Sequence, residues 1–263
     1  MKKFIKYLIF LCLISFSYVA YSDNHMPKTY GMEGWQCNFD KGKDLDDLKR
    51  FTKKFNPYAD KNWNKPYSSF ILTPFLRSEE EVNFDVAWVG FTNNHVDLGN
   101  IQDSWFATGG NIAAEFESIT DCNTIGYYIA AEAREPTVPF EEGKDAYFAI
   151  YSCSFKEGKS GLDLTTNDKS WNEYNDNRGF TGGVWRWWPG PGTSNSFEGD
   201  FLMNISFNSM EELGQYLDDR LRDSFAGTRP ESILNCDNPR VYTAYNARNR
   251  PFEDSQPEES NSE

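Results

Sequence analysis

The sequence predicts an α+β protein that consists of two similar units, each with the element order βαββαβ. The first observation is a set of short matches between the two halves, which recur in the same order at a nearly constant spacing and therefore indicate an internal repeat. The matches pair Cys37 with Cys153, Ser118 with Ser232, Cys122 with Cys236, and Ala133-Arg134 with Ala247-Arg248. The second observation is that each half alternates segments of strand and helix periodicity in that order.

In the first unit, alternating side chains predict four strands, over residues 33–39, 67–76, 83–92 and 125–134. An amphipathic helix is expected over residues 43–56, where the apolar positions Leu45, Leu48, Phe51 and Phe55 lie on one side. A second helical region, residues 94–118, should be broken at Gly109-Gly110.

The second unit predicts strands near residues 146–155, 180–188, 200–207 and 240–248. Its second helix should begin at Ser209, because Ser209 and Glu212 have the spacing of a capping box. Its first helix, over residues 160–176, has the weakest pattern, since the segment is rich in Asn, Asp, Thr and Gly.

The N-terminal segment predicts export. Three lysines precede the apolar stretch from Tyr7 to Val19, and Ala20-Tyr21-Ser22 offers a cleavage pattern, so residues 1–22 are interpreted as a signal peptide. A membrane anchor is the alternative, but the apolar stretch is short for a span. The predicted organisation is a first repeat over 30–136, a linker over 137–144, a second repeat over 145–251 and a disordered acidic tail over 252–263. We expect a periplasmic or secreted protein.

The charge of the chain excludes some partners. The formal net charge is −14, and cleavage of the signal peptide would make it more negative. An acidic surface repels nucleic acids and anionic lipid headgroups. We therefore expect no nucleic-acid partner and no membrane span after cleavage, whereas the oligomeric state stays open.

Four cysteines follow the predicted cleavage site, and in an oxidising compartment disulfides are the default. Three pairings are possible in principle. The repeat favours Cys37–Cys122 and Cys153–Cys236, because each unit then carries the same bridge. A zinc site is the alternative, but the chain has no Cys-x-x-Cys motif and only two histidines.

The βαββαβ order of each unit resembles the ferredoxin-like fold. Two fused units resemble the dimeric α+β-barrel group, in which two four-stranded antiparallel sheets face each other, and the chain is similar to uncharacterised secreted bacterial proteins built as such a tandem. This resemblance implies an intrachain pseudo-dimer. The group includes heme-handling enzymes, cofactor-free monooxygenases, isomerases and ligand binders, so the fold alone leaves the function open.

Strand alternation assigns side chains to the two faces of each sheet. The face of Cys37 should pack against the helices, together with Ala87, Val89 and Phe91 of the third strand. The opposite face is polar and aromatic and should point inward, toward the other sheet. Its expected members are Gln36, Asn38, Trp88, Tyr128, Glu132, Arg134, Ser152, Ser154, Asn204, Tyr242, Asn246 and Arg248. They could satisfy one another's hydrogen bonds and hold the sheets in register, or they could line a small-molecule cavity.

From this face we select the candidate ligand-binding residues, which are Arg248, Trp88, Tyr242, Asn204, Asn38 and Arg134. Arg248 is expected to be the arginine free for a ligand, because Glu132 can pair with Arg134 whereas its counterpart in the second unit is Asn246. Glu132 is a weak candidate for acid–base catalysis. No cofactor and no metal are expected.

Two further features each allow a structural and a functional interpretation. In Trp185-Arg186-Trp187-Trp188, alternation sends Trp185 and Trp187 to one face, where they could stack a flat ligand or fill a core. His95 stands at a predicted helix start, where it could ligate heme iron but is more often solvated.

The leading functional prediction is binding of a small organic ligand between the two sheets. The alternatives are a cofactor-independent enzyme, monooxygenase- or isomerase-like, and an envelope module that binds another protein.

Overall fold

The computed structural model describes residues 27–78, 80, 82–250 and 252 of the 263-residue chain. The predicted signal peptide and, apart from Phe252, the predicted acidic tail lie outside the described residues. Within the described part, no helix is long and apolar enough to cross a membrane.

The first half of the chain follows the predicted order of elements. They are β1 (Thr29–Phe39), α2 (Leu45–Asn62), β2 (Ser68–Leu76), β3 (Val86–Thr92), α3 (His95–Thr108), α4 (Gly110–Glu117) and β4 (Thr120–Arg134). Helix α2 begins at a capping box between Asp44 and Asp47. The predicted break at Gly109 is confirmed, since α3 ends there and α4 begins.

The second half has the same order with two small additions. Its elements are β5 (Asp145–Phe155), the short 3₁₀ helix η1 (Gly161–Asp163), α5 (Leu164–Asn177), β6 (Val184–Pro189), β7 (Phe201–Phe207), α6 (Met210–Ala226), β8 (Leu234–Cys236) and β9 (Arg240–Arg248). Helix α6 starts as predicted, because the Ser209 side chain accepts a hydrogen bond from the Glu212 backbone N–H.

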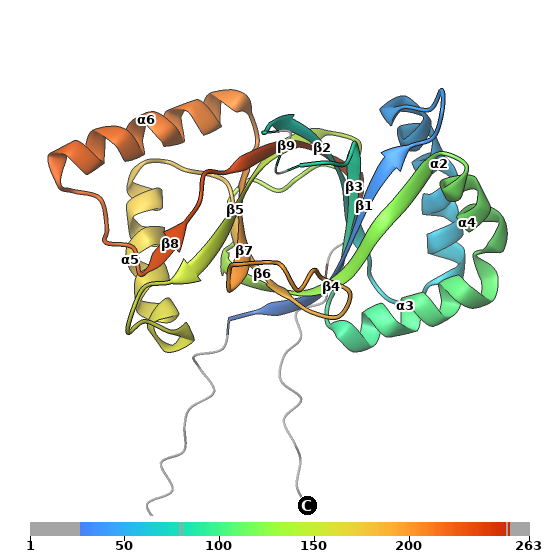
Figure 1. Ribbon diagram of the computed structural model, residues 1–263, viewed down its shortest axis with the longest axis horizontal. Helices are drawn as coiled ribbons and strands as arrows, with labels where there is room; N and C mark the ends of the chain where they lie inside the picture. The colour runs from blue at the N-terminus through green and yellow to red at the C-terminus, as the bar shows by residue number, and fades with distance from the viewer. Residues whose placement is uncertain (1–26, 79, 81, 251, 253–263) are drawn as a thin grey trace, which may run out of the picture.

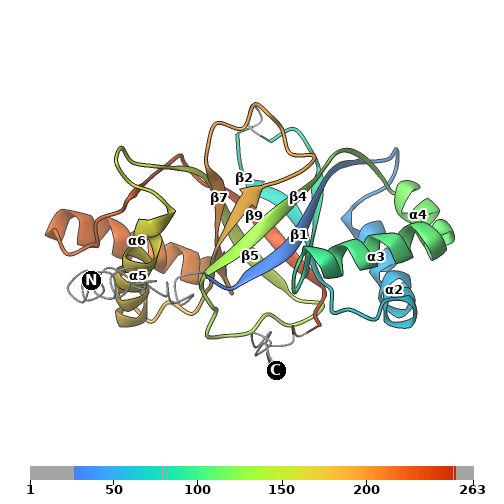
Figure 2. The ribbon, with the colours of Figure 1, turned by 90° about the horizontal axis from the view of Figure 1, so that it is seen from below.

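The strands form one closed antiparallel barrel. In the first half the strands lie in the order β4-β1-β3-β2, and in the second half the order β9-β5-β7-β6 follows the same scheme. β2 pairs with β9 and β4 pairs with β6, which closes the barrel, while β8 extends β5 at its edge. All helices lie outside: α2, α3 and α4 cover one side and α5 and α6 the opposite side (Figure 1 and Figure 2).

Both predicted disulfides are confirmed. Cys37 is bonded to Cys122, its neighbour across the β1–β4 ladder, and Cys153 is bonded to Cys236 across the β5–β8 ladder. Each bridge therefore fixes the first strand of one half to the segment that follows the last helix of that half.

The core is divided by the barrel wall. As predicted, Cys37 faces the helices, where it packs with Leu48 and Phe51 of α2 and Phe116 of α4. A second cluster, which includes Met32, Ala130, Phe148 and Tyr242, fills part of the barrel interior.

The predicted faces of β3 are wrong. Ala87 and Val89 point into the barrel, and Trp88 packs on the helix side. The reason is register: Trp88 lies directly opposite Trp35 in the β1–β3 ladder, and directly paired residues share a face. The prediction was in effect displaced by one residue along this strand, and a displacement of one residue exchanges the two faces of a strand.

Candidate functional site

The barrel interior contains a chamber at each end. One chamber, of about 410 Å³, is named here the Glu132 chamber because Glu132 of β4 lines it. Aromatic residues form a large part of its wall: Tyr30, Phe70, Phe91, Phe140, Phe148, Trp185, Trp187 and Phe252. Large rings around a cavity of this size are typical of sites for flat organic molecules.

The second chamber, of about 470 Å³, lies at the opposite end and is named the Tyr128 chamber. Apolar side chains such as Met32, Leu72 and Val89 form its inner wall, and polar residues from the segment after β6 line it as well. Trp187 lines both chambers and lies between them. The predicted alternation of the Trp185–Trp188 segment is confirmed, because Trp185 and Trp187 pack inside the barrel.

Glu132 forms a polar pair with Tyr30 in the aromatic wall. The Tyr30 hydroxyl donates to Oε2 of Glu132 over 3.1 Å. Burial raises the pKa of Glu132, and burial together with the charge of Glu132 raises the pKa of Tyr30 to about 12. A carboxyl group with a raised pKa can exchange protons with a ligand closer to neutral pH than an exposed one.

Two buried polar atoms in this wall have no partner in the described part of the protein. They are Oδ1 of Asn204, a residue that is 1% exposed, and the indole Nε1 of Trp187. Buried polar atoms are normally hydrogen-bonded, since an unsatisfied one costs about 1–3 kcal/mol. Asn204 therefore offers an acceptor to a molecule inside the Glu132 chamber.

The two candidate arginines do not reach these chambers. Arg248 ends β9 and is only 3% exposed. Its guanidinium donates to the carbonyls of Tyr67 (3.1 Å) and Asn56 (3.3 Å) and pairs with Oδ1 of Asp60 at 2.7 Å. The expectation that Arg248 is the free arginine is therefore wrong.

Arg134 makes the matching contacts on the other half. It donates to the carbonyls of Gly182 (3.2 Å) and Phe180 (2.9 Å) and pairs with Asp176 at 2.7 Å. The expected pairing of Arg134 with Glu132 is also wrong. A register shift between these two residues in the β4–β6 ladder turns the arginine outward, toward α5.

The remaining predicted residues are distributed as follows. Asn204 lines the Glu132 chamber and Tyr242 the Tyr128 chamber, which leaves both as candidates. Asn38 pairs with Asp121 at the end of β1 and lines neither chamber, and Trp88 lies outside the barrel. Sequence reasoning missed Tyr30, although the alternation of Tyr30, Met32 and Gly34 could have extended the first strand to include it.

Cavities also lie outside the barrel, beneath the helices of both halves. The arginine pocket, of about 270 Å³, lies at α5 and α6 and is lined by Arg186, Arg220 and Arg229 among others. The aromatic pocket, of about 40 Å³, lies between β1, β3 and the helices of the first half.

The single histidine in the described part, His95, begins α3 and is exposed, with Nε2 3.0 Å from the Tyr128 carbonyl oxygen. It lines none of these cavities, and no group of three or more His, Cys, Asp or Glu side chains that could hold a metal ion occurs among the described residues.

The architecture can be compared with solved structures. A protein proposed to be a monooxygenase, from Lactobacillus acidophilus, aligns with a TM-score of 0.50 at 8% identity, over 84% of this chain and 95% of that one. The chain has the dimeric α+β-barrel fold. A protein of the same description from Fusobacterium nucleatum aligns at a TM-score of 0.45 and 13% identity, over 84% and 95% of the two chains. A chlorite dismutase variant from Candidatus Nitrospira defluvii aligns at 0.47 and 10% identity, over 84% and 92%.

These identities inform on the fold alone. No protein-family model matches the sequence, and no curated protein matches it either. Activity must therefore be argued from the side chains of this chain.

Proposed function

We propose that the protein binds a small, flat organic molecule inside the barrel, in the Glu132 chamber. The observation that carries this proposal is the unpaired Oδ1 atom of the buried Asn204 beside the rings that line the chamber. A ligand with an aromatic ring and one hydroxyl group would stack on the rings and donate to Asn204. Burial of ring surface supplies the affinity, and the single hydrogen bond supplies the preference for a hydroxylated ligand.

The test uses 1-naphthol and naphthalene as probes and the full chain as the protein. Asn204 and Asn246 form a matched pair, since both are buried with an unpaired Oδ1 atom and only Asn204 lines the chamber. We expect quenching of tryptophan fluorescence by 1-naphthol at lower concentration than by naphthalene. Asn204→Leu should reduce this preference about fivefold, as expected for one hydrogen bond, and Asn246→Leu should leave it unchanged. Equal effects of both variants, or no binding of either probe, would refute the proposal.

A second candidate function is cofactor-independent catalysis in the same chamber. It is supported by Glu132, whose raised pKa and contact with Tyr30 suit a base that removes a proton from a bound carbon acid. 2-Tetralone is a suitable probe, because its C–H protons exchange with deuterium when a base removes them. Wild-type protein should accelerate this exchange and Glu132→Gln should not, as followed by NMR. If the variant is as active as the wild type, Glu132 is not the base.

We further infer that the two halves form an intrachain pseudo-dimer that arose from a duplicated unit. The matched strand orders and matched disulfides support this inference. Matched contacts at the two boundaries between the halves, named here the seams, also support it. Asn56 donates to the carbonyl of Ala247, and Asn172 donates to that of Ala133, both over 2.9 Å. The test is to replace Arg134 and Arg248, the arginines at the two seams, one at a time. Equal losses of unfolding free energy are expected if the halves are equivalent.

We also propose that the protein is exported after cleavage before Asp23. Its two disulfides support an oxidising compartment. The test is fractionation of the source cells followed by N-terminal sequencing of the mature protein. A chain that retains residues 1–22 in the cytoplasm would refute the proposal.

A further inference from the structure

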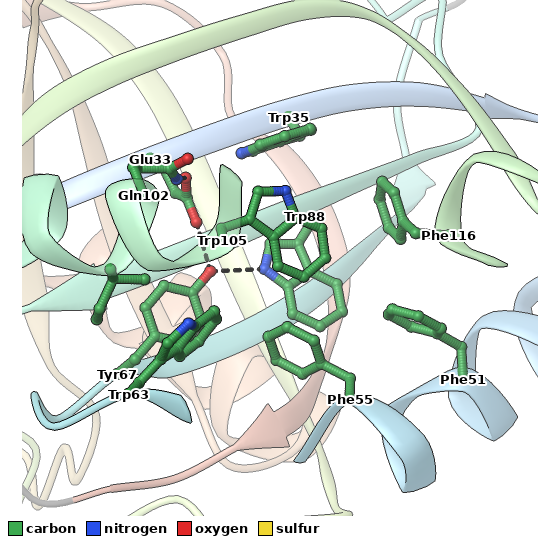
Figure 3. A pocket seen from close by; sticks show the side chains of 11 residues that line it. Glu33, Trp35, Phe51, Phe55, Trp63, Tyr67, Trp88, Gln102, Trp105 and Phe116 are labelled. Carbon is green, nitrogen blue, oxygen red and sulfur yellow. Dashed lines mark hydrogen bonds between the residues drawn. The ribbon is translucent and has the colours of Figure 1, made fainter. Parts of the chain in front are cut away.

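The aromatic pocket lies on the outer face of the first half and is separate from the barrel chambers. Rings from the sheet and from all three helices of this half surround it, as Figure 3 shows. The pocket is lined by the indoles of Trp35, Trp63, Trp88 and Trp105, with Phe55 and Phe116 beside them. Many of these rings meet edge to face, for example Phe55 and Trp88 at 5.0 Å between centroids.

One carboxylate, that of Glu33, lies in this aromatic surrounding. Glu33 is 4% exposed, and it accepts hydrogen bonds from the Tyr67 hydroxyl (2.6 Å) and from the Gln102 amide. The Trp88 indole N–H in turn donates to the Tyr67 hydroxyl over 2.8 Å (Figure 3). No lysine or arginine of the described residues forms an ion pair with Glu33. A buried carboxylate without a counter-charge is costly, so its retention requires an explanation.

The backbone is adapted to this arrangement at Gly90. Gly90 lies directly opposite Glu33 in the β1–β3 ladder. A Cβ atom at Gly90 would lie 2.0 Å from the Tyr67 hydroxyl oxygen, so only glycine lets this hydroxyl reach Glu33. The orientation of the carboxylate is thus fixed by the fold.

One indole nitrogen at the pocket is unsatisfied. Nε1 of Trp63 is buried and has no hydrogen-bond partner in the described part of the protein. It offers a donor to an occupant that carries an acceptor group. At about 10–15 Å³ for one water, the about 40 Å³ of this pocket corresponds to about three waters, so only a small group fits without movement of the rings.

The pocket at the corresponding position in the second half contains a cation. Tyr151 stands two residues before Cys153, as Trp35 does before Cys37, and it lines the arginine pocket. In that pocket the guanidinium of Arg220 lies over the rings of Trp171 (4.5 Å) and Tyr216 (5.0 Å). The second half therefore supplies its own cation to its rings, whereas the described residues that line the aromatic pocket include rings and a carboxylate but no lysine or arginine.

We propose that the aromatic pocket binds a small organic ammonium ion that carries a hydroxyl group, with Glu33 as counter-ion and the indole faces around the cationic head. Aromatic faces attract ammonium groups, most strongly when the site is desolvated. A hard metal cation suits the site less well, because Ca²⁺ requires six to eight oxygen ligands and Mg²⁺ an octahedral set.

The test compares choline with 3,3-dimethylbutan-1-ol, which has the same shape without the charge. Calorimetric titration of the full chain should show choline binding at least tenfold more tightly than the alcohol. Glu33→Gln should remove this preference, whereas the control Glu132→Gln, which changes the carboxyl group inside the barrel, should retain it. Trp105→Leu removes a ring at the pocket without touching Glu33 and should weaken choline binding as well.

The outcomes distinguish a pocket that binds an ammonium ion from an apolar core that binds none. Equal binding of choline and the alcohol, no binding of choline to the wild type, or undiminished choline binding by Glu33→Gln would each overturn it. If Glu33→Gln fails to fold, Trp105→Leu decides: unchanged choline affinity in that variant overturns the proposal. Because the probes of the barrel chamber are uncharged aromatic compounds, failure here leaves the proposed function untouched.

Discussion

Replacement of Arg248 by methionine should destabilise the protein strongly, and replacement of Arg134 should do so by a similar amount. Each arginine is almost fully buried and donates to two backbone carbonyls as well as to one aspartate of the first helix in the other half. Methionine retains the apolar stem of the side chain but none of its donors.

The expected loss of unfolding free energy depends on the backbone carbonyls that each substitution leaves without a donor. A buried carbonyl that loses its partner costs about 1–3 kcal/mol. The ion pair itself adds little, because the side chains of Asp60 and Asp176 are 49% and 62% exposed and an exposed pair contributes at most about 1 kcal/mol. We therefore expect each variant to lose about 2–4 kcal/mol of unfolding free energy, or about 4–16 °C in Tm for a chain of this size.

The assay is urea denaturation followed by tryptophan fluorescence, with Arg222→Met as the control. Arg222 also pairs with aspartates, but its side chain is 58% exposed, so its loss should stay within about 0.5 kcal/mol. If Arg248→Met falls within that same range, Arg248 does not hold the two halves together. If Arg248 and Arg134 differ by more than about 2 kcal/mol, the two seams are not equivalent.

Three further predictions concern the disulfides and the buried acids. Loss of the Cys37–Cys122 bridge by double serine substitution should cost about 4 kcal/mol in urea denaturation, because the bridge closes a separation of 85 residues; an unchanged midpoint would contradict this. Burial raises the pKa of Glu33, so the stability of the wild type should fall as pH rises from about 4, the pKa in the unfolded chain, through the raised value. Glu33→Gln should lack this decline, and parallel pH profiles of unfolding would contradict the assignment. In an ultraviolet titration, the tyrosine step near pH 12 should be absent from Tyr30→Phe and should move to lower pH in Glu132→Gln, because the charge of Glu132 raises the pKa of Tyr30.

The order of elements and the disulfides could be predicted because both depend on local pattern and on the repeat. The Ser209 cap and the glycine break at Gly109 are signals within a few residues, and the structure confirms both, although the Glu212 side chain accepts from the backbone N–H of Asn208 instead of completing a capping box with Ser209. The weakly patterned segment 160–176 also forms a helix, α5, since Tyr174 and Asn175 are buried against the rest of the second half. Here packing compensates for a poor local pattern.

The candidate site could be predicted only in part, because it depends on register. Asn204 and Tyr242 line the chambers, as their alternation indicated. Trp88 lies on the other face because the β1–β3 pairing places it opposite Trp35. Arg134 and Arg248 lie outside the barrel because the register shifts beside them turn the strand ends outward. A one-residue shift leaves no trace in the sequence of a single strand, yet it exchanges the two faces.

Some contacts occur in both halves and stabilise the fold, whereas other side chains differ between the halves and line their cavities. The bridges and the arginine–aspartate pairs occur in both halves, so they belong to the framework that the two halves share. Glu132 has Asn246 as its counterpart, and the ring cluster around Glu33 corresponds to a pocket with three arginines in the second half. A barrel needs no such differences for closure, and an unpaired buried carboxylate or amide oxygen lowers stability. The ligands proposed above would offset the cost of keeping Glu33 and Asn204.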